Sequence, residues 1–331
     1  MILEWIIKSL ILIVVLLTGF AYLTYYERKA LARIQVRIGP NRAGPGGWLQ
    51  PVADAIKLIF KEELIPARAD RLVFILAPII TVIPALIILA VVPWGDRITL
   101  FGREISMGIA DVNVGVLYIL AVASISVYGI VLAGWASNNK YAMMGGLRSS
   151  AQMISYELAL GLAFIGPVML AGSLSIQDII KAQSPVWFAV YQPIGFVIFL
   201  IASLAEVNRA PFDMPEAEQE LVAGYHTEYS GMKFALFFMA EYIKMLAVSV
   251  IAASLFLGGY RGPLVDVWPW LGPIYLFLKV FVLLFGMIWV RATLPRFRYD
   301  RLMAFGWKVM LPIALANVFF TAVVIVALQP A

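Results

Sequence analysis

Ionisable side chains inside apolar segments are the residues of this sequence best placed to do chemistry. Glu157, Glu241, Lys244 and Lys279 lie within long apolar runs, and Glu206 ends another. A charge at the centre of a bilayer costs about 2.5–3.5 kcal/mol on insertion scales. Such groups must therefore face the interior of a helix bundle, pair with opposite charges, or be neutral part of the time.

These buried charges allow two interpretations. They could be interhelical ion pairs that only hold helices together, or they could form a pathway for protons or ions. Glu241 and Lys244 are three residues apart and share one face of a helix. A buried carboxylate beside a lysine can change its protonation state when its surroundings change. We favour the pathway, because small residues and van der Waals contacts already suffice for helix association.

A second group of carboxylates lies in the segment between residues 206 and 233. Against the two bases Arg209 and Lys233, this segment holds six acids: Glu206, Asp213, Glu216, Glu218, Glu220 and Glu228. Three of them would share one face if the segment after Pro215 is helical: Asp213, Glu216 and Glu220. The EF-hand spacing is absent, which disfavours a calcium site. A solvated loop is the simpler alternative, but the interleaved prolines and Phe212 indicate a loop packed against another part of the protein.

Cysteine is absent from the chain, and His226 is its single histidine. Disulfides, thiolate nucleophiles, iron–sulfur ligation and covalent attachment of a c-type haem are therefore excluded, and one histidine cannot supply both axial ligands of a b-type haem. The sequence also lacks a glycine-rich P-loop, a zinc motif and a serine–histidine arrangement, which disfavours ATP-driven transport and metal-assisted hydrolysis. We expect no metal site, and we expect His226 to be a surface or hydrogen-bonded residue.

The composition places these residues in a membrane. Hydrophobic residues make up 62% of the 331 positions and charged residues 14%, against about 45–50% and about 25% in soluble domains. Eight apolar runs are each long enough to cross a bilayer as a helix: about 5–26, 72–93, 114–134, 153–171, 187–205, 234–256, 272–290 and 309–328. The first is too long for the apolar part of a signal peptide and lacks a cleavage site. We therefore predict an all-α, polytopic membrane helix bundle with about eight transmembrane helices, in a single integral membrane domain over residues 1–331.

The positions of the basic residues predict which side each loop faces. Of the 25 lysines and arginines, 18 lie in or beside the odd-numbered loops, five in the even-numbered loops and the N-terminus, and two within spans. This bias puts the odd-numbered loops, at about 27–71, 135–152, 206–233 and 291–308, in the cytoplasm or matrix. Both termini are then on the outer side.

The first of these loops is the longest. Residues 38–48 are rich in glycine and proline and are expected to form a structured turn region. Residues 52–62 have the pattern of an amphipathic helix, with Val52, Ile56 and Ile59 opposite the charged Asp54, Lys57 and Lys61. Such a helix can lie in the membrane interface. A cap over the bundle, with no ligand role, is an equally acceptable interpretation.

Four segments carry a resemblance to a known family. They read GWLQPVADAIKLIFKE (47–62), AEVNRAPFDMPEAE (205–218), FFMAEY (237–242) and IWVRATLPRFRYD (288–300). Together they closely resemble a membrane subunit of proton-pumping NADH–quinone oxidoreductase, respiratory complex I, which is designated H in bacteria and 1 in mitochondria. The resemblance extends from Tyr26 to Lys308, and two of the motifs match the family's patterns in full.

The resemblance implies a place at the junction between a peripheral redox arm and a membrane arm. Residues expected to line a quinone passage are Glu27, Arg28, Arg37 and Arg291. Asp54 and Glu62 or Glu63 would lie near the mouth of this passage. An acidic coupling loop near the chamber would consist of Asp213, Glu216, Glu218 and Glu220. A proton path would use Glu157, Glu206 and Glu241, and Lys279 would be a basic partner at membrane depth.

The same resemblance implies partners and cofactors. It predicts no cofactor bound by this chain alone, a quinone as substrate, and iron–sulfur clusters and FMN in partner subunits. Peripheral iron–sulfur subunits would contact the cytoplasmic loops, and proton-pumping membrane subunits would lie alongside in the bilayer. The chain would be a subunit without a redox centre in an H⁺-translocating enzyme. We expect a bacterial plasma membrane in preference to the mitochondrial inner membrane, and no nucleic acid.

Three other functions stay open at this point. One is a membrane anchor of a related energy-converting hydrogenase or of a ferredoxin-driven complex, because the electron donor is not encoded in this chain. Another is a stand-alone ion or solute transporter, which the lack of internal repeats disfavours. The third is a passive scaffold, in which the buried charges only hold helices together.

Overall fold

The computed structural model describes the chain except for residues 1, 101–102, 185, 215–221, 266 and 329–331. Within the described part, seven helices are long and apolar enough to cross a bilayer. They are α1 (Ile2–Ile34), α3 (Arg71–Ile87), α4 (Gly115–Ala136), α5 (Lys140–Ala171), α10 (Gly231–Phe256), α11 (Leu271–Thr293) and the segment that ends in α13 (Leu311–Leu328). The fifth predicted run, about 187–205, forms the shorter apolar helix α8 (Pro193–Glu206). The prediction of a polytopic helix bundle is confirmed.

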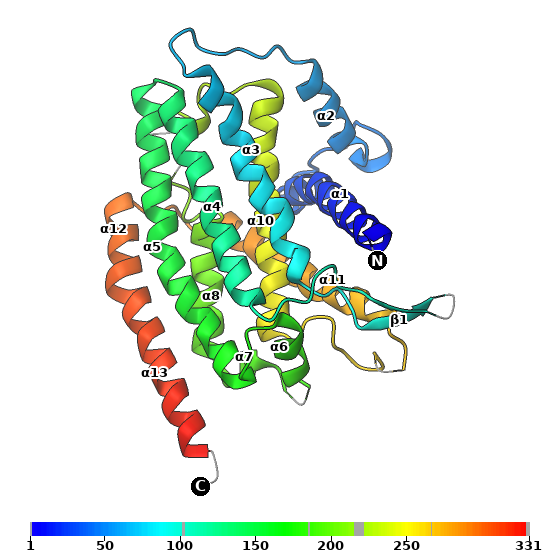
Figure 1. The fold of residues 1–331 in the computed structure, drawn as a ribbon. Helices are drawn as coiled ribbons and strands as arrows, with labels where there is room; N and C mark the ends of the chain where they lie inside the picture. Colours follow the sequence, from blue (N-terminus) through cyan, green and yellow to red (C-terminus); the bar gives the residue numbers. More distant parts are fainter. Residues whose placement is uncertain (1, 101–102, 185, 215–221, 266, 329–331) are drawn as a thin grey trace.

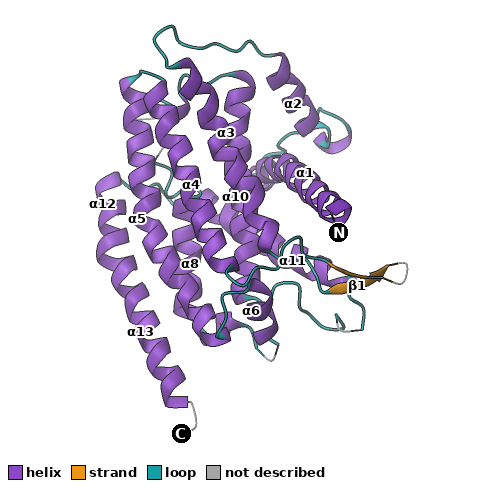
Figure 2. Ribbon diagram, in the orientation of Figure 1, coloured by secondary structure: helices purple, strands orange, loops and turns teal. Residues whose placement is uncertain are grey.

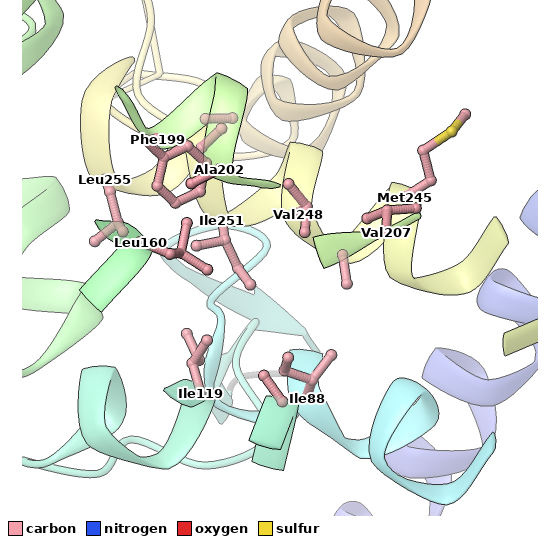
Figure 3. Close-up of a cluster of buried hydrophobic side chains, with 14 of the residues drawn as sticks. Ile88, Ile119, Leu160, Phe199, Ala202, Val207, Met245, Val248, Ile251 and Leu255 are labelled. Atoms are coloured by element: carbon pink, nitrogen blue, oxygen red, sulfur yellow. The ribbon is translucent and has the colours of Figure 1, made fainter. Parts of the chain in front are cut away.

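The helices form one bundle around a large apolar core, with a second, smaller buried cluster that includes Phe74, Tyr229 and Phe237. Helices α3, α4, α5 and α10 run side by side along the length of the molecule, whereas α1 is strongly inclined to them (Figure 1). Helix α1 packs on α10 and α11, and α5 contacts α4, α8 and α13. Side chains from α4, α5, α8 and α10 meet in the core, among them Ile119, Leu160, Phe199 and Ile251 (Figure 3).

Short elements connect these helices. Helix α2 (Gln50–Phe60) confirms the amphipathic helix expected in the first loop, and it follows the short helix η1 (Pro45–Gly47). The remaining short helices are η2 (Ile88–Val91), α6 (Ile176–Ala182), α7 (Phe188–Tyr191), η3 (Gly224–His226), α12 (Tyr299–Phe305) and the π-helical turn η4 (Gly306–Met310). One antiparallel hairpin, β1 (Arg97–Leu100) with β2 (Arg103–Ser106), was not predicted (Figure 2). Its four-residue strands are too short to give a clear alternating pattern.

Two helix boundaries differ from the sequence prediction, and both shape the site. Helix α5 begins at Lys140, where Asn139 caps it by accepting a hydrogen bond from the Tyr141 amide at 2.9 Å. Most of the loop expected at 135–152 is therefore helical. Hydropathy missed this part because its buried face carries polar residues such as Ser149 and Gln152. Helix α8 ends about half-way along α5 (Figure 1), so the segment after Glu206 starts inside the bundle.

A close backbone approach at Gly145 gives a test of this packing. A Cβ atom there would lie 2.7 Å from the Gly224 Cα atom, whereas a Cβ atom at Gly161, on the same helix, would meet nothing within 4 Å. We expect Gly145→Ala to destabilise the protein by about 1–3 kcal/mol, because overpacking forces the backbone to shift. Gly161→Ala should be neutral or stabilising, because alanine favours helix. Thermal unfolding of the two variants in detergent compares them, and equal midpoints would contradict the packing described here.

Candidate functional site

Four charged side chains from different parts of the chain form one network in the bundle interior. Arg209 lies in the turn after α8, and its Nε atom is 2.6 Å from Glu241 Oε1 on α10. Its Nη1 atom is 3.2 Å from Glu27 Oε1 on α1, and Arg291 on α11 pairs with the same Glu27 oxygen. We call the series Arg291–Glu27–Arg209–Glu241 the charge network. It ties α1, α10 and α11 to the turn that follows α8.

The two central residues of the charge network are buried, so they need their ion pairs to offset the loss of contact with water. The side chains of Glu27 and Arg209 are only 4% and 7% exposed. Removing a charge from water costs several kcal/mol, and a partner with good geometry offsets this cost. The planar guanidinium of Arg209 meets this need because it presents several donors and contacts two carboxylates at once. Its carbon Cζ also lies 4.3 Å from the centre of the Tyr242 ring, a cation–π contact.

Further ionisable residues, Glu206 and Lys244, lie close to Glu241 at the end of the charge network. A cavity of about 20 Å³ is bordered by Glu206, Glu241 and Lys244, which is room for about one water molecule. A neighbouring cavity of about 20 Å³ again has Glu206 and Lys244 in its lining. The Lys244 Nζ atom donates to Ser126 Oγ at 2.6 Å, and Ser124 donates to the Glu157 carboxylate. The structure thus brings three predicted proton-path acids and Lys244 into one region.

Lys279, the fourth residue predicted for the proton path, lies elsewhere. Its ammonium group donates to the carbonyl oxygens of Leu257, Gly259 and Arg261 at 2.7, 2.8 and 2.7 Å. It also lies 5.3 Å from the centre of the Trp187 ring. These contacts satisfy all three donors of the ammonium group, so within the described residues its partners are backbone carbonyls that follow α10.

A large cavity lies beside α1, and Arg37 is the one predicted quinone residue in its lining. This cavity has a volume of about 930 Å³, and aromatic and basic side chains line it: Tyr25, Tyr26, Lys29, Arg33, Arg37, Trp48 and Phe285. Arg28 pairs with Asp54 of α2 at 2.8 Å, and Glu63 pairs with Lys233. The Glu62 side chain is exposed, and its carbonyl oxygen accepts a hydrogen bond from Ser230. The structure therefore places Arg37 at the cavity, whereas Glu27 and Arg291 belong to the charge network.

The acidic segment is only partly described. Glu216, Glu218 and Glu220 lie outside the described residues. Arg296 donates to the carbonyl oxygen of Asp213, and the Phe297 amide donates to the carbonyl oxygen of Pro211 at 3.2 Å. The first part of the segment thus packs against the connection between α11 and α12, as the interleaved prolines and phenylalanine indicated.

His226 is packed among aromatic rings. Its ring centre lies 4.9 Å from that of Tyr225 and 5.4 Å from that of Phe234. Burial lowers the pKa of His226 from 6.5 to about 4, because removal from water disfavours the charged imidazolium. The side chain is therefore neutral at physiological pH. Between the folded and unfolded pKa values only the unfolded chain binds the proton, so this histidine contributes stability above about pH 6.5 that is lost as the pH falls toward 4.

Sequence reasoning missed the residue at the centre of the charge network. Arg209 entered only as one of two bases in an acidic segment, although the burial of an acidic, proline-containing segment would itself require an internal cation. The described residues contain no group of three or more histidines, cysteines or carboxylates arranged to bind a metal ion.

Comparison with known proteins agrees with the geometry. The family model described as NADH dehydrogenase matches residues 7–322. A protein from Thermomicrobium roseum that is named as the H subunit of NADH-quinone oxidoreductase is 55% identical over 325 residues, covering 95% of this chain and 94% of that protein. The chain belongs to this NADH dehydrogenase family. Relatives with corresponding names from Geobacter metallireducens and Protochlamydia amoebophila are 54% and 53% identical and cover 95% and 92% of this chain.

Membership in the NADH dehydrogenase family confirms the resemblance carried by the four sequence motifs. All the charge-network residues lie within the matched range. The chain is therefore a multi-pass membrane subunit of an oxidoreductase complex of this family.

Proposed function

We propose that this chain forms part of the quinone chamber of an NADH–quinone oxidoreductase and couples quinone reduction to proton translocation. The observation that carries the proposal is the continuity of charged groups. Tyr26 lines the large cavity, and the next residue, Glu27, is the buried centre of two ion pairs. From there Arg209 leads to Glu241, which borders a cavity shared with Glu206 and Lys244. The charged groups thus extend from the residue that follows the cavity-lining Tyr26 in the chain to the buried acids.

The large cavity suits a quinone headgroup. A volume of about 930 Å³ lies in the range of roughly 300–1,000 Å³ that is common for small-molecule sites. The rings of Tyr25, Tyr26 and Trp48 offer flat apolar contacts, and Arg33 and Arg37 supply positive charge. Positive groups favour the negative charge that develops when a quinone accepts electrons. The quinone takes up two electrons and two protons to become the quinol, and the electrons come from a partner subunit.

The charge network suggests how such a change could reach the buried acids. Negative charge arriving near Arg291 attracts this arginine and weakens its pairing with Glu27. Arg209 then pairs more strongly with Glu27 and less strongly with Glu241, because one guanidinium is shared between the two carboxylates. With its counter-charge withdrawn, Glu241 gains affinity for a proton. When protonation to the neutral quinol removes this negative charge, the original pairing returns and the proton is released from Glu241 toward Glu206 and Lys244.

The partners follow from the same proposal. The chain holds no redox centre of its own, because it has no cysteine and a single histidine packed among aromatic rings. Peripheral subunits with iron–sulfur clusters and FMN dock on the loops that carry most of the lysines and arginines, and proton-pumping membrane subunits lie beside the bundle. The relatives named above are bacterial, which supports the bacterial plasma membrane as the location.

Filling the large cavity tests its assignment as the quinone passage. Ala30 lines this cavity, and we expect Ala30→Trp in the assembled complex to raise the KM for a long-tailed quinone by about tenfold, a loss of about 1.4 kcal/mol of binding. Steady-state rates with long- and short-tailed quinones measure the effect. Ala55→Trp, at an exposed position on α2 away from the cavity lining, is the matched control. Unchanged kinetics in Ala30→Trp would count against the passage.

A further inference from the structure

The turn that carries Arg209 is an irregular segment inside the bundle. After α8 ends at Glu206, the chain reverses through residues 207–212, with a left-handed conformation at Asn208 (φ 57°). Its internal hydrogen bonds include Arg209 N to Leu204 O at 3.3 Å and Phe212 N to Arg209 O at 2.8 Å. Backbone groups buried without such partners carry a high cost, so an irregular turn at this depth needs donors from neighbouring helices.

Gln152 on α5 supplies those donors from one buried side chain. Its Nε2 atom lies 2.7 Å from the Ala205 carbonyl oxygen, 2.7 Å from the Phe212 carbonyl oxygen and 3.1 Å from Asn208 Oδ1. The side chain is 0% exposed. All three neighbours are acceptors, which fixes the amide with its nitrogen toward the turn.

The two carbonyl groups bracket Arg209. Ala205 lies four residues before the arginine and Phe212 three residues after it, so one amide group ties the two ends of the turn together. Asn208 adds a link to the same helix, because its Nδ2 atom donates to Ser149 Oγ at 3.1 Å. Gln152 and Ser149 are three residues apart on α5 and therefore share a face. These hydrogen bonds thus fix the position of the turn relative to one rigid helix, α5.

We propose that Gln152 is a positioning residue, which holds Arg209 at the distance where it contacts Glu27 and Glu241 together. This inference rests on the proposed function, since it gives Gln152 a role in coupling through the charge network. Arg209 must satisfy two carboxylates on two different helices, α1 and α10. A displacement of the turn by about 1 Å is enough to break one of these contacts. The hydrogen bonds that Gln152 donates go to Ala205, Asn208 and Phe212 of the turn, so it acts through the shape of the turn.

The loss of the Gln152 hydrogen bonds can be tested without unfolding the protein, because apolar contacts also hold the turn in place. The Phe212 ring stacks on Phe297, with ring centres 5.6 Å apart, and packs against Tyr156 at 5.7 Å. The Tyr156 hydroxyl in turn donates to the Leu302 carbonyl oxygen at 2.9 Å. These contacts keep the segment in its place when the amide of Gln152 is removed, and what is lost is the exact shape of the turn.

The test uses Gln152→Met in the whole complex in native membranes. Methionine keeps the length and flexibility of the side chain and removes the oxygen and the nitrogen of its amide group. The matched control is Gln183→Met, because Gln183 is another buried glutamine that donates to a carbonyl oxygen, that of Ser254 at 2.9 Å, but in a different part of the bundle. The measurements are electron transfer to a soluble acceptor, protons translocated per quinone reduced, and the pH profile of quinone reduction.

We expect Gln152→Met to assemble, to reduce the soluble acceptor normally, and to lose proton translocation by about tenfold, inside the range of up to about 10²-fold that a 1 Å misplacement produces. The pH profile should shift in the same direction as in Arg209→Gln. Combining the two changes should give no further loss beyond Arg209→Gln alone, because both act through the same contacts. Gln183→Met should translocate protons as the unaltered complex does.

Several outcomes would overturn the inference. Normal coupling in Gln152→Met while Arg209→Gln is impaired would remove the positioning role and leave the proposed function standing. Multiplicative losses in the double variant would show that the two residues act separately. Loss of assembly in Gln152→Met but not in Gln183→Met would assign Gln152 a structural role. In that case Asn208→Gly is the second test, because glycine keeps the left-handed backbone and removes the Asn208 oxygen that accepts from Gln152. Normal pumping by Asn208→Gly would then overturn the positioning role. Normal pumping by an assembled Arg209→Gln complex would instead refute the proposed function.

Discussion

Replacing Arg209 with glutamine is expected to reduce coupled quinone reduction by about 10²-fold or more. Removing one partner from a buried ion pair costs about 3–5 kcal/mol, because the remaining charge is left without compensation. Here a single change removes a partner of Glu241 at 2.6 Å and one of the two arginines that pair with Glu27. If the same cost falls on the coupled step, in which Arg209 is shared between the two carboxylates, its lower limit corresponds to about 10²-fold in rate at 1.4 kcal/mol for each factor of ten.

Quinone reduction and proton translocation by membranes containing the assembled variant measure this effect. Arg97→Gln is the matched control, since Arg97 also pairs with a glutamate, but on the exposed hairpin, where the two side chains are 70% and 66% exposed. Exposed pairs contribute about 0–1 kcal/mol. Arg209→Lys should keep the charge but give an intermediate rate, because an ammonium group lacks the planar fork that contacts both carboxylates. Wild-type rates in assembled Arg209→Gln would contradict the charge network as a functional unit.

Replacing Glu241 with glutamine is expected to abolish proton translocation while the complex still assembles. Glutamine has nearly the same shape and can still accept a hydrogen bond from Arg209, but its amide cannot carry the proton. Because Glu241 borders the cavity shared with Glu206 and Lys244, we expect translocation to fall by at least about tenfold, equivalent to 1.4 kcal/mol or more on the transfer step.

Proton uptake by vesicles, normalised to quinone reduced, is the measurement for Glu241→Gln. Glu104→Gln, in the exposed pair with Arg97, is its control. A scaffold in which buried charges only hold helices together predicts a different pattern, with pumping preserved wherever assembly is preserved. An assembled Glu241→Gln complex that pumps at the normal ratio would therefore favour the scaffold over the proposed function.

The positions of the apolar runs predicted the spans well, because bilayer thickness sets a minimum length for an apolar helix. The prediction failed where helices carry polar residues toward the interior. The first three turns of α5 were assigned to a loop because Ser149, Ser150 and Gln152 lower the hydropathy, yet these residues are buried in the bundle. Hydropathy records composition along the chain and contains no information about which face of a helix meets a neighbour.

Pairing among the charges was decided by the tertiary structure. The i, i+3 spacing of Glu241 and Lys244 placed them on one face, and both do border the same cavity. Their closest partners nevertheless come from elsewhere: Glu241 pairs with Arg209, and Lys244 donates to Ser126. Partners more than 30 residues away in sequence are invisible to local spacing rules, because helix packing brings them together.

The sequence by itself determined the membrane location, the family, and the inventory of groups that can act: a few acids and two lysines inside apolar runs, no cysteine and a single histidine. Those properties follow from composition, because transfer free energies depend on residue type. Only the tertiary structure decided that Arg209 is shared between Glu27 and Glu241 and that Gln152 shapes the turn that carries it. The physical reason is that ion pairs and hydrogen bonds act over a few ångströms, so their strength depends on how helices pack.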